Sequence, residues 1–267
     1  MTGDALEVMG LRYAYGKNPV LRGVDFTASR GELVCVLGAN GAGKTTLFRC
    51  LLRLLDGYSG TIRYDGADIR GLTARGIAQQ MAYVPQSPAP TFDYSAFETV
   101  LMGTDASTAH LSGPRAPQRE AAREALEAVG IAGLADRGIK TLSGGERQLV
   151  LIARSLAQRS AMIVMDEPTA NLDYGNQLRV MSDIRGLTRR GYLVVTSTHS
   201  PQLALLFADR VVVLDEGVVT AIGDPAAVMD AALISRIYGV GVELHNVQTA
   251  WGTVPVLAPC VAPGEGT

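Results

Sequence analysis

The sequence lacks two kinds of apolar segment, and each absence excludes a class of protein. No run approaches the ~20 apolar residues that a helix needs to span a bilayer. The N-terminus has no charged segment followed by an apolar stretch of roughly 7–15 residues, as a secretory signal would have. We therefore expect a chain that is neither secreted nor membrane-spanning by itself.

Cysteine and net charge are also scarce. The three cysteines, Cys35, Cys50 and Cys260, are scattered and lack the spacing of a metal site, so we expect reduced thiols of a cytosolic protein. The 24 lysines and arginines face 26 acidic residues, for a formal net charge of −2. No basic field favours nucleic acid, and we expect no nucleic-acid partner.

Apolar side chains are abundant: 47% of the 267 residues are hydrophobic and 19% are charged. This composition supports a sizeable core, and the length suits one α/β unit with an inserted subdomain. Helical stretches at 174–190 and 201–208 alternate with near-continuous apolar runs, which indicates a parallel sheet covered on both faces. The apolar runs predict buried strands at 33–37, 161–165, 192–195 and 210–214.

Three further segments contain β-favouring patterns. Residues 6–28 alternate apolar and polar side chains and predict an antiparallel hairpin, and residues 60–70 show the same alternation. The tail from 240 to 267 mixes β-favouring residues with proline and glycine. We interpret its His245 and Trp251 as structural residues that pack or cap.

From residue 91 to residue 158 the pattern becomes helical. The run Arg119 to Val129 places Ala122, Leu126 and Val129 on one face and charged residues elsewhere. Arginine and acidic residues interleave on that charged side, which favours a solvated face over a docking surface. Glycine, serine, threonine and proline accumulate between 103 and 118 and predict a loop.

The segment from Gly38 to Thr45 reads Gly-Ala-Asn-Gly-Ala-Gly-Lys-Thr and matches the phosphate-binding pattern Gly-x-x-x-x-Gly-Lys-Ser/Thr. An apolar run precedes it and a helix-favouring stretch, 46–55, follows it. Glycines let backbone N–H groups approach phosphates, and the helix points its positive end at them. Lys44 then reaches the β- and γ-phosphates, and the Thr45 hydroxyl is placed to bind Mg²⁺.

Two acidic residues and a serine–glycine segment add to this prediction. Asp166 and Glu167 follow an apolar run and should emerge at the carboxyl edge of the sheet, where one acid can hold Mg²⁺ through water and the other can activate water. An ordinary strand-to-loop exit explains the two acids equally well. The segment Leu142-Ser-Gly-Gly-Glu146 precedes a helix expected to begin near Arg147, so Ser143 and the glycines form an anion-ready helix start or a plain N-cap.

These three motifs, in this order, resemble the ATP-binding cassette family. The resemblance implies an α/β fold: a P-loop NTPase core with a mostly parallel sheet and helices on both faces, an N-terminal antiparallel β subdomain and an inserted α-helical subdomain. It places the core with its β subdomain at 1–90 and 161–240, the helical signature subdomain at 91–160 and a C-terminal extension at 241–267. It implies ATP and Mg²⁺ as ligands. The implied ATP-binding residues are Tyr15, Gly38, Asn40, Gly41, Ala42, Gly43, Lys44, Thr45 and Thr46.

The resemblance also gives roles to residues outside the phosphate loop. Glu167 matches the general base, His199 the γ-phosphate contact, and Gln86 the glutamine that touches Mg²⁺ and water. Tyr15 matches the aromatic residue that stacks on adenine, with Tyr13 as a competitor. From the residues alone, His199 fits a core histidine better. The implied catalytic set is Glu167, His199 and Gln86, and the implied Mg²⁺ set is Thr45, Gln86 and Asp166.

Family members act as pairs, so the resemblance implies a head-to-tail homodimer. ATP on Lys44 of one copy would be covered by the segment Leu142–Glu146 of the other, which we call the signature segment. Asp173 would lie at the dimer interface. Neither copy alone is then a complete ATPase. The signature residues implied to bind ATP across the dimer are Leu142, Ser143, Gly144, Gly145 and Glu146.

Within the family, the chain is most similar to ATPases of iron-siderophore, haem, cobalamin and molybdate importers. This branch implies integral membrane permease subunits as partners, a substrate-binding protein as an indirect partner, and a peripheral location on the cytoplasmic face of the bacterial inner membrane. Two departures are Ser200, where an acid commonly follows the histidine, and Met102-Gly-Thr-Asp105, which lacks an arginine-containing stretch. Two alternatives stay open: the ATPase of an exporter, or a soluble cassette protein without a permease.

Overall fold

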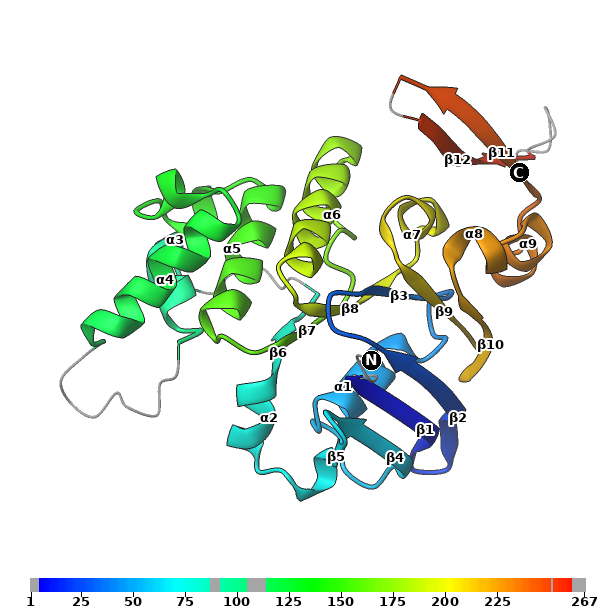
Figure 1. The fold of residues 1–267 in the computed structure, drawn as a ribbon, viewed down its shortest axis with the longest axis horizontal. Helices are drawn as coiled ribbons and strands as arrows, with labels where there is room; N and C mark the ends of the chain where they lie inside the picture. The colour runs from blue at the N-terminus through cyan, green and yellow to red at the C-terminus, as the bar shows by residue number, and fades with distance from the viewer. Residues whose placement is uncertain (1–4, 87–91, 105–113, 251, 261–267) are drawn as a thin grey trace.

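A six-stranded sheet forms the centre of the molecule (Figure 1). The computed structural model describes residues 5–86, 92–104, 114–250 and 252–260. Five strands are parallel and β10 is antiparallel to its neighbour β9, as expected of a mostly parallel sheet. In spatial order the strands are β10 (Val218–Gly223), β9 (Arg210–Asp215), β3 (Leu33–Leu37), β8 (Leu193–Thr198), β7 (Met162–Met165) and β6 (Met81–Val84).

The N-terminal part forms a second, antiparallel sheet, which confirms the predicted hairpin and the predicted β pattern of 60–70. Its alternating burial explains the alternating sequence: one face packs inward and the other contacts water. In spatial order its strands are β2 (Asn18–Ala28), β1 (Leu6–Tyr15), β4 (Ser59–Tyr64) and β5 (Ala67–Asp68).

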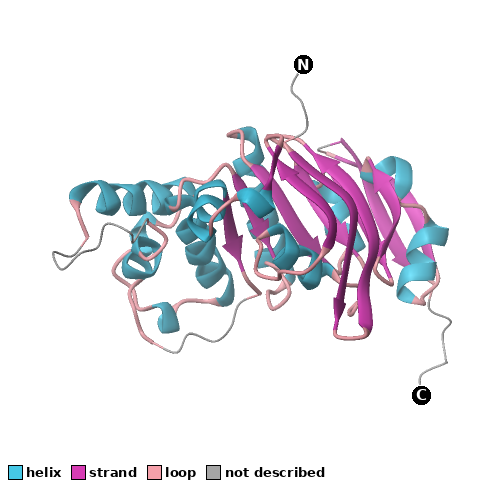
Figure 2. Cartoon of the chain, turned by 90° about the horizontal axis from the view of Figure 1, so that it is seen from below, coloured by secondary structure: helices cyan, strands magenta, loops and turns pink. Residues whose placement is uncertain are grey.

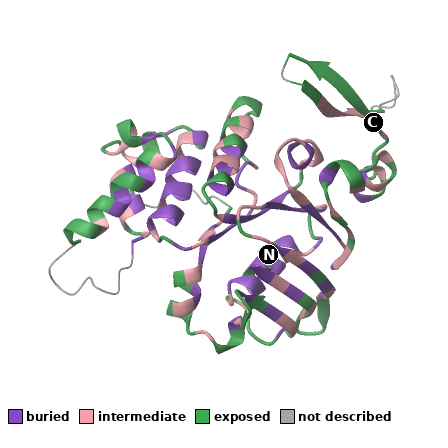
Figure 3. Ribbon diagram, viewed as in Figure 1, coloured by how far each residue is buried: buried purple, intermediate pink, exposed green. Residues whose placement is uncertain are grey.

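Two apolar layers enclose the central sheet, because successive side chains of a strand point to opposite faces. In β3, Cys35 belongs to the layer shared with the helices, whereas Val34 and Val36 belong to the layer shared with the antiparallel sheet and α1 (Lys44–Leu51). All the residues of β3, β7 and β8 are buried (Figure 3). The continuous apolar runs of the sequence are therefore strands covered on both faces.

The helices between β6 and β7 form a lobe at one end of the molecule, which Figure 2 shows from another side. Two of them, α4 and α5, begin earlier in the chain than expected. Helix α4 starts inside the predicted loop, where Pro117 suits a first helical turn, and residues 105–113 of that loop lie outside the described residues. The buried face of α4 includes Ala122 and Leu126, as predicted. The lobe contains α3 (Ala96–Leu101), α4 (Ala116–Ala128) and α5 (Gly144–Ala157).

The remaining helices flank the sheet. Helix α6 (Tyr174–Arg189) and helix α7 (Pro201–Phe207) confirm the two predicted helical stretches. The others are α2 (Ala74–Gln80), α8 (Pro225–Val228) and α9 (Ala231–Tyr238). In the part of the chain that the structure describes, no helix combines the length and the apolar character needed to cross a membrane.

The tail forms a two-stranded antiparallel hairpin of β11 (Val242–Thr249) and β12 (Gly252–Pro259). Figure 3 shows it largely exposed. Our interpretation of His245 as a packing or capping residue is wrong: the side chain is exposed, and its Nε2 lies 3.0 Å from Oε2 of Glu243. An alternating strand with one solvated face leaves such a side chain in water. Trp251 lies outside the described residues.

Candidate nucleotide site

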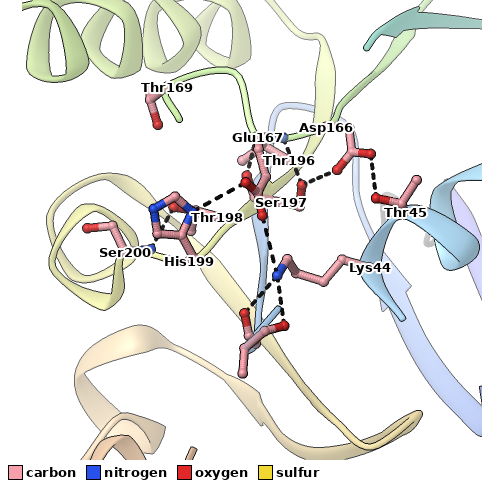
Figure 4. Close-up of polar contacts among 12 residues, drawn as sticks. Lys44, Thr45, Asp166, Glu167, Thr169, Thr196, Ser197, Thr198, His199 and Ser200 are labelled. Atoms are coloured by element: carbon pink, nitrogen blue, oxygen red, sulfur yellow. Dashed lines mark hydrogen bonds and ion pairs between the residues drawn. The ribbon is translucent and has the colours of Figure 1, made fainter. Parts of the chain in front are cut away.

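The candidate site lies where β3, β7 and β8 end at the same edge of the central sheet. Because these strands are parallel neighbours, the segments that follow them meet there. Figure 4 shows Lys44 and Thr45 at the start of α1, Asp166 and Glu167 after β7, and His199 after β8 converging on one region. The sheet order thus joins three sequence motifs that are far apart in the chain.

The phosphate loop is tightly packed against the sheet. A Cβ on Gly38 would lie 2.3 Å from the carbonyl oxygen of Leu214 in β9, so only glycine permits this approach. Gly43, just before α1, has a φ of 108°, a conformation that favours glycine. Along the rest of the loop, Asn40, Gly41 and Thr45 are exposed, whereas Ala42, Lys44 and Thr46 are buried.

Lys44 is the buried cation of the loop, with 6% of the residue exposed. Its Nζ donates hydrogen bonds to the carbonyl oxygens of Gly38 at 2.8 Å and Ala39 at 3.1 Å. The same nitrogen lies 3.4 Å from Oε1 of Glu167 (Figure 4). The lysine therefore binds the loop backbone and faces an acid that follows β7.

Asp166 joins the phosphate loop to two other strands. Its Oδ2 accepts a hydrogen bond from the Thr45 hydroxyl at 2.7 Å, and its Oδ1 accepts one from the Ser197 hydroxyl at 2.7 Å. Its backbone N–H donates to the carbonyl oxygen of Val84 in β6. With 3% of the residue exposed, this carboxylate is buried and bound on both oxygens.

Ser197 is a site residue that our sequence reasoning missed. It is fully buried in β8, and its hydroxyl also accepts a hydrogen bond from the backbone N–H of Glu167 at 2.9 Å. One serine thereby holds both members of the acidic pair. The available signal was a polar triplet, Thr196 to Thr198, at the end of an apolar strand.

Glu167 and His199 form the outer part of the cluster. Oε2 of Glu167 lies 3.3 Å from Nδ1 of His199, whose side chain is 49% exposed. The interpretation of His199 as a core histidine is therefore wrong. Glu167 has a φ of 46°, which is strained for a residue with a side chain. Two strand ends thus meet through one acid–histidine contact.

Two predicted residues lie outside this hydrogen-bonded cluster. Gln86 is exposed, two residues after the end of β6. Tyr15 is 42% exposed at the end of β1 and contacts Tyr13 edge to face, with ring centroids 5.0 Å apart. Tyr13 packs against the apolar layer under the antiparallel sheet, which leaves Tyr15 as the accessible ring.

The signature segment forms the start of α5. Ser143 caps this helix, since its hydroxyl accepts from the N–H of Glu146 at 3.3 Å, while the Glu146 carboxylate accepts from the Ser143 N–H at 2.8 Å. That backbone hydrogen bond lowers the pKa of Glu146. This reciprocal capping explains why α5 begins at Gly144 instead of near Arg147.

Residues after Asp166 and Glu167 pack against this segment. Asp173 caps α6 by accepting from the Asn176 N–H at 2.9 Å, which lowers the pKa of the Asp173 carboxyl. A Cβ on Gly145 would lie 2.6 Å from Oδ1 of Asn176, and one on Gly144 would lie 3.2 Å from Leu172. Within the described ranges, no hydrogen bond or ion pair connects Leu142–Glu146 with the phosphate loop of the same chain.

The donors in the site suit a magnesium ion bound together with phosphates. Mg²⁺ in proteins is held by one or two carboxylates, hydroxyls, waters and substrate phosphate oxygens. The Thr45 hydroxyl and the Asp166 carboxylate, 2.7 Å apart, supply such hard oxygen donors. Among the described residues, no group of three or more histidine, cysteine or acidic side chains is arranged to hold a metal by itself.

A glycine-rich phosphate loop between a buried strand and a helix, with an acid from another strand end of the same sheet bound to its threonine, defines a P-loop nucleoside triphosphatase. A sequence model of the family described as ABC transporter matches residues 21–170. The chain belongs to the ABC transporter family. The predictions of this family, of its fold and of ATPase activity are confirmed.

Individual relatives agree with this assignment. The hemin import ATP-binding protein HmuV of Rhodococcus jostii is 39% identical over 256 residues, covering 94% of this chain and 86% of the relative. HmuV of Streptomyces coelicolor is 39% identical over 253 residues, covering 94% and 89%. A solved structure described as an inward-facing metal-chelate type ABC transporter has a TM-score of 0.85 at 28% identity, covering 97% of this chain and 98% of that one.

Proposed function

We propose that this chain is the ATP-hydrolysing subunit of a bacterial importer that takes up a metal chelate through a separate permease. The observation that carries the ATPase role is the network of Lys44, Thr45, Asp166, Glu167 and Ser197 at one sheet edge. The importer role and the cargo class are supported by relatives named for hemin import and by a structural neighbour of the metal-chelate type. The candidate cargoes are iron-siderophore, haem, cobalamin or a metal oxyanion.

Each polar group of the network has a role in this proposal. Lys44 binds the β- and γ-phosphate oxygens. When ATP is bound, these oxygens replace the loop carbonyls and Glu167 as partners of the Lys44 Nζ. Glu167 accepts the proton of the attacking water, and His199 contacts the γ-phosphate. Thr45, Asp166 and Gln86 would hold Mg²⁺, which when bound neutralises charge on the β- and γ-phosphates.

Catalysis in this scheme is mainly positioning. Ser197 fixes the backbone of Glu167 and one oxygen of Asp166, so the two acids keep separate tasks. Tyr15 offers an exposed ring for the adenine, and the exposed Asn40 and Gly41 contact phosphates through their backbone. A phosphoryl transfer that needs little covalent help from the protein depends on such placement.

We propose that a second copy completes the site. Within one described chain, the signature residues Leu142 to Glu146 make no polar contact with the phosphate loop, yet Ser143 and the glycines form a helix start suited to anions. A head-to-tail dimer would place them over the ATP of the partner, with Asp173 at the interface. Both copies would contact the same γ-phosphate. Hydrolysis removes this shared contact, so the dimer opens and its movement drives a permease.

A groove beside the helical lobe is the proposed permease contact. It has a volume of about 760 Å³, and the exposed apolar side chains Leu54 and Met102 line it. The segment at Met102 lacks the arginine that many such importers carry, but Arg154 of α5 lines the same groove. A Cβ on Gly103 would clash with the Arg154 carbonyl at 2.0 Å, so glycine allows this close packing. Through this contact the chain would lie peripherally on the cytoplasmic face of the inner membrane.

The test is to purify the tagged full-length chain from gently solubilised native membranes and to identify the accompanying proteins by mass spectrometry. A many-helix permease of the metal-chelate type is the expected result. Recovery from the soluble fraction alone would contradict the transport role. Phosphate release by the purified chain, measured with MgATP and after EDTA addition, tests the ATPase and its metal separately.

A further inference from the structure

Gln202 of helix α7 makes two hydrogen bonds to the C-terminal hairpin. Its Nε2 donates a hydrogen bond to the carbonyl oxygen of Pro255 at 2.9 Å, and its Oε1 accepts one from the N–H of Leu257 at 2.9 Å. Both backbone groups belong to β12, which among the described residues pairs with β11 alone, in a two-stranded sheet. One amide thus satisfies a donor and an acceptor on the outer edge of this strand.

The geometry resembles that of a neighbouring strand. In a β-strand, the carbonyl of one residue and the N–H of the residue two positions later point to the same edge. The Gln202 amide has one acceptor and one donor group. It therefore makes the hydrogen bonds that a peptide group of an adjacent strand would make. Apolar contacts reinforce the attachment, since Leu257 and Leu244 of the hairpin pack against the same apolar layer as Leu203 of α7.

The N-terminal end of α7, where Gln202 lies, directly follows the catalytic cluster. Ser200 caps the helix by accepting from the N–H of Leu203 at 3.4 Å, and its own N–H donates to the Thr198 hydroxyl at 3.0 Å. His199, the residue before this cap, lies 3.3 Å from Glu167. Only Ser200 and Pro201 separate His199 from Gln202 along the chain.

The C-terminal part approaches the same acid from helix α9. The hydroxyl of Tyr238 is buried without a hydrogen-bond partner. Burial raises the pKa of Tyr238, and the charge of Glu167 raises it further. Figure 1 shows α7, α9 and the hairpin on the same side of the central sheet.

We propose that Gln202 is a positioning residue that uses the C-terminal hairpin to hold His199 in place for γ-phosphate cleavage. This inference rests on the proposed ATPase mechanism and adds the hairpin to it. Gln202 acts through His199 and touches no reacting atom. Loosening the attachment should lower turnover without weakening ATP binding, because the phosphate loop and Lys44 are unchanged.

The experiment compares Gln202→Ala and Gln202→Glu with the wild type in the full-length chain. Gln248→Ala is the matched control, because Gln248 donates to Thr253 within the hairpin and does not bind α7. We expect Gln202→Ala to lower kcat roughly tenfold while KM for ATP changes less than about twofold, as expected for a misplaced catalytic group. Gln202→Glu keeps the acceptor for Leu257 and loses the donor for Pro255. Its kcat should therefore lie between that of the wild type and that of Gln202→Ala.

A second readout observes His199 without requiring turnover. The chain has three histidines, so the imidazole ¹H–¹⁵N signals can be assigned with a His199→Gln variant. Gln202→Ala should shift the His199 signals, whereas Gln248→Ala should leave them unchanged. Unchanged His199 signals in folded Gln202→Ala, or a kcat equal to that of Gln248→Ala, would overturn the inference. A wild type without ATPase activity would instead refute the proposed function, and the signals would still test the coupling.

Discussion

Nζ of Lys44 lies 3.4 Å from Oε1 of Glu167, and both side chains are largely buried. The lysine comes from the phosphate loop, and the acid comes from the strand that follows the helical lobe. In a weakly solvated setting, each charge stabilises the other. The proposed general base is therefore also a partner of the phosphate-binding lysine.

The first prediction concerns Glu167→Gln. The amide cannot accept the proton of the attacking water, so kcat should fall about 10²-fold or more, whereas ATP affinity should be preserved because Lys44 and the phosphate loop are unchanged. Phosphate release at saturating MgATP and ATP binding by calorimetry measure the two effects. Glu120→Gln, an exposed glutamate of α4, is the control. Unchanged turnover in Glu167→Gln would exclude the role.

The second prediction concerns Ser197→Ala. Loss of the hydroxyl leaves Oδ1 of Asp166 without its donor and the Glu167 N–H without its acceptor, in a fully buried position. We expect the free energy of unfolding to fall by about 1–3 kcal/mol. Turnover should also fall, because both acids lose their common anchor. Urea unfolding and phosphate release are the measurements.

Thr188→Ala provides the comparison for Ser197→Ala, since the Thr188 hydroxyl is buried but binds only Arg185 of its own helix. Its turnover should equal that of the wild type. If Ser197→Ala also keeps full turnover, Ser197 is only a packing residue.

The third prediction concerns Gly145→Ala. The new Cβ would lie 2.6 Å from Oδ1 of Asn176 and would displace this side chain, whose Nδ2 donates to Asp173 at 2.7 Å. Weakening the cap of α6 should lower the free energy of unfolding by about 1 kcal/mol. Adding Asn176→Ala removes the clash, so the double variant should lose less than the sum of the two single variants. Simple additivity in thermal unfolding would show that the clash is not the cause.

The fourth prediction concerns the pH dependence of the signature helix. The N–H of Ser143 lowers the pKa of Glu146 in the folded state. The stability from this carboxylate is therefore fully present above the pKa of the unfolded chain and is lost as the pH falls through the lower folded value. The difference in unfolding free energy between wild type and Glu146→Gln should be largest near pH 7 and should shrink below about pH 4. A difference independent of pH would show that the charge contributes nothing.

Several features of the fold followed from local patterns. Continuous apolar runs predicted β7, β9 and the first part of β8, because strand positions covered on both faces favour apolar side chains. Alternation predicted the β1–β2 hairpin, since one of its faces contacts water. The start of α5 was predicted near Arg147, but the helix begins at Gly144, directly after its cap Ser143.

The tail and Ser197 show where local reading fails. Residues of β11 are mostly exposed and those of β12 mostly half-buried, and the hairpin is held by Gln202 from another element. Ser197 is a common residue type, and its importance depends entirely on which oxygen and which N–H lie beside it. Neither the attachment of the hairpin by Gln202 nor the hydrogen bonding of Ser197 produces a periodic pattern in the sequence.

The sequence by itself determined the phosphate loop, because the conformation and chemistry of Gly38 to Thr45 depend on residue types a few positions apart. Only the tertiary structure decided that Asp166 binds Thr45, that Glu167 faces Lys44 and that Gln202 binds the hairpin to α7. These contacts join segments that are distant in the chain. Their distances are fixed by strand order and packing, which arise from the apolar layers of the whole domain.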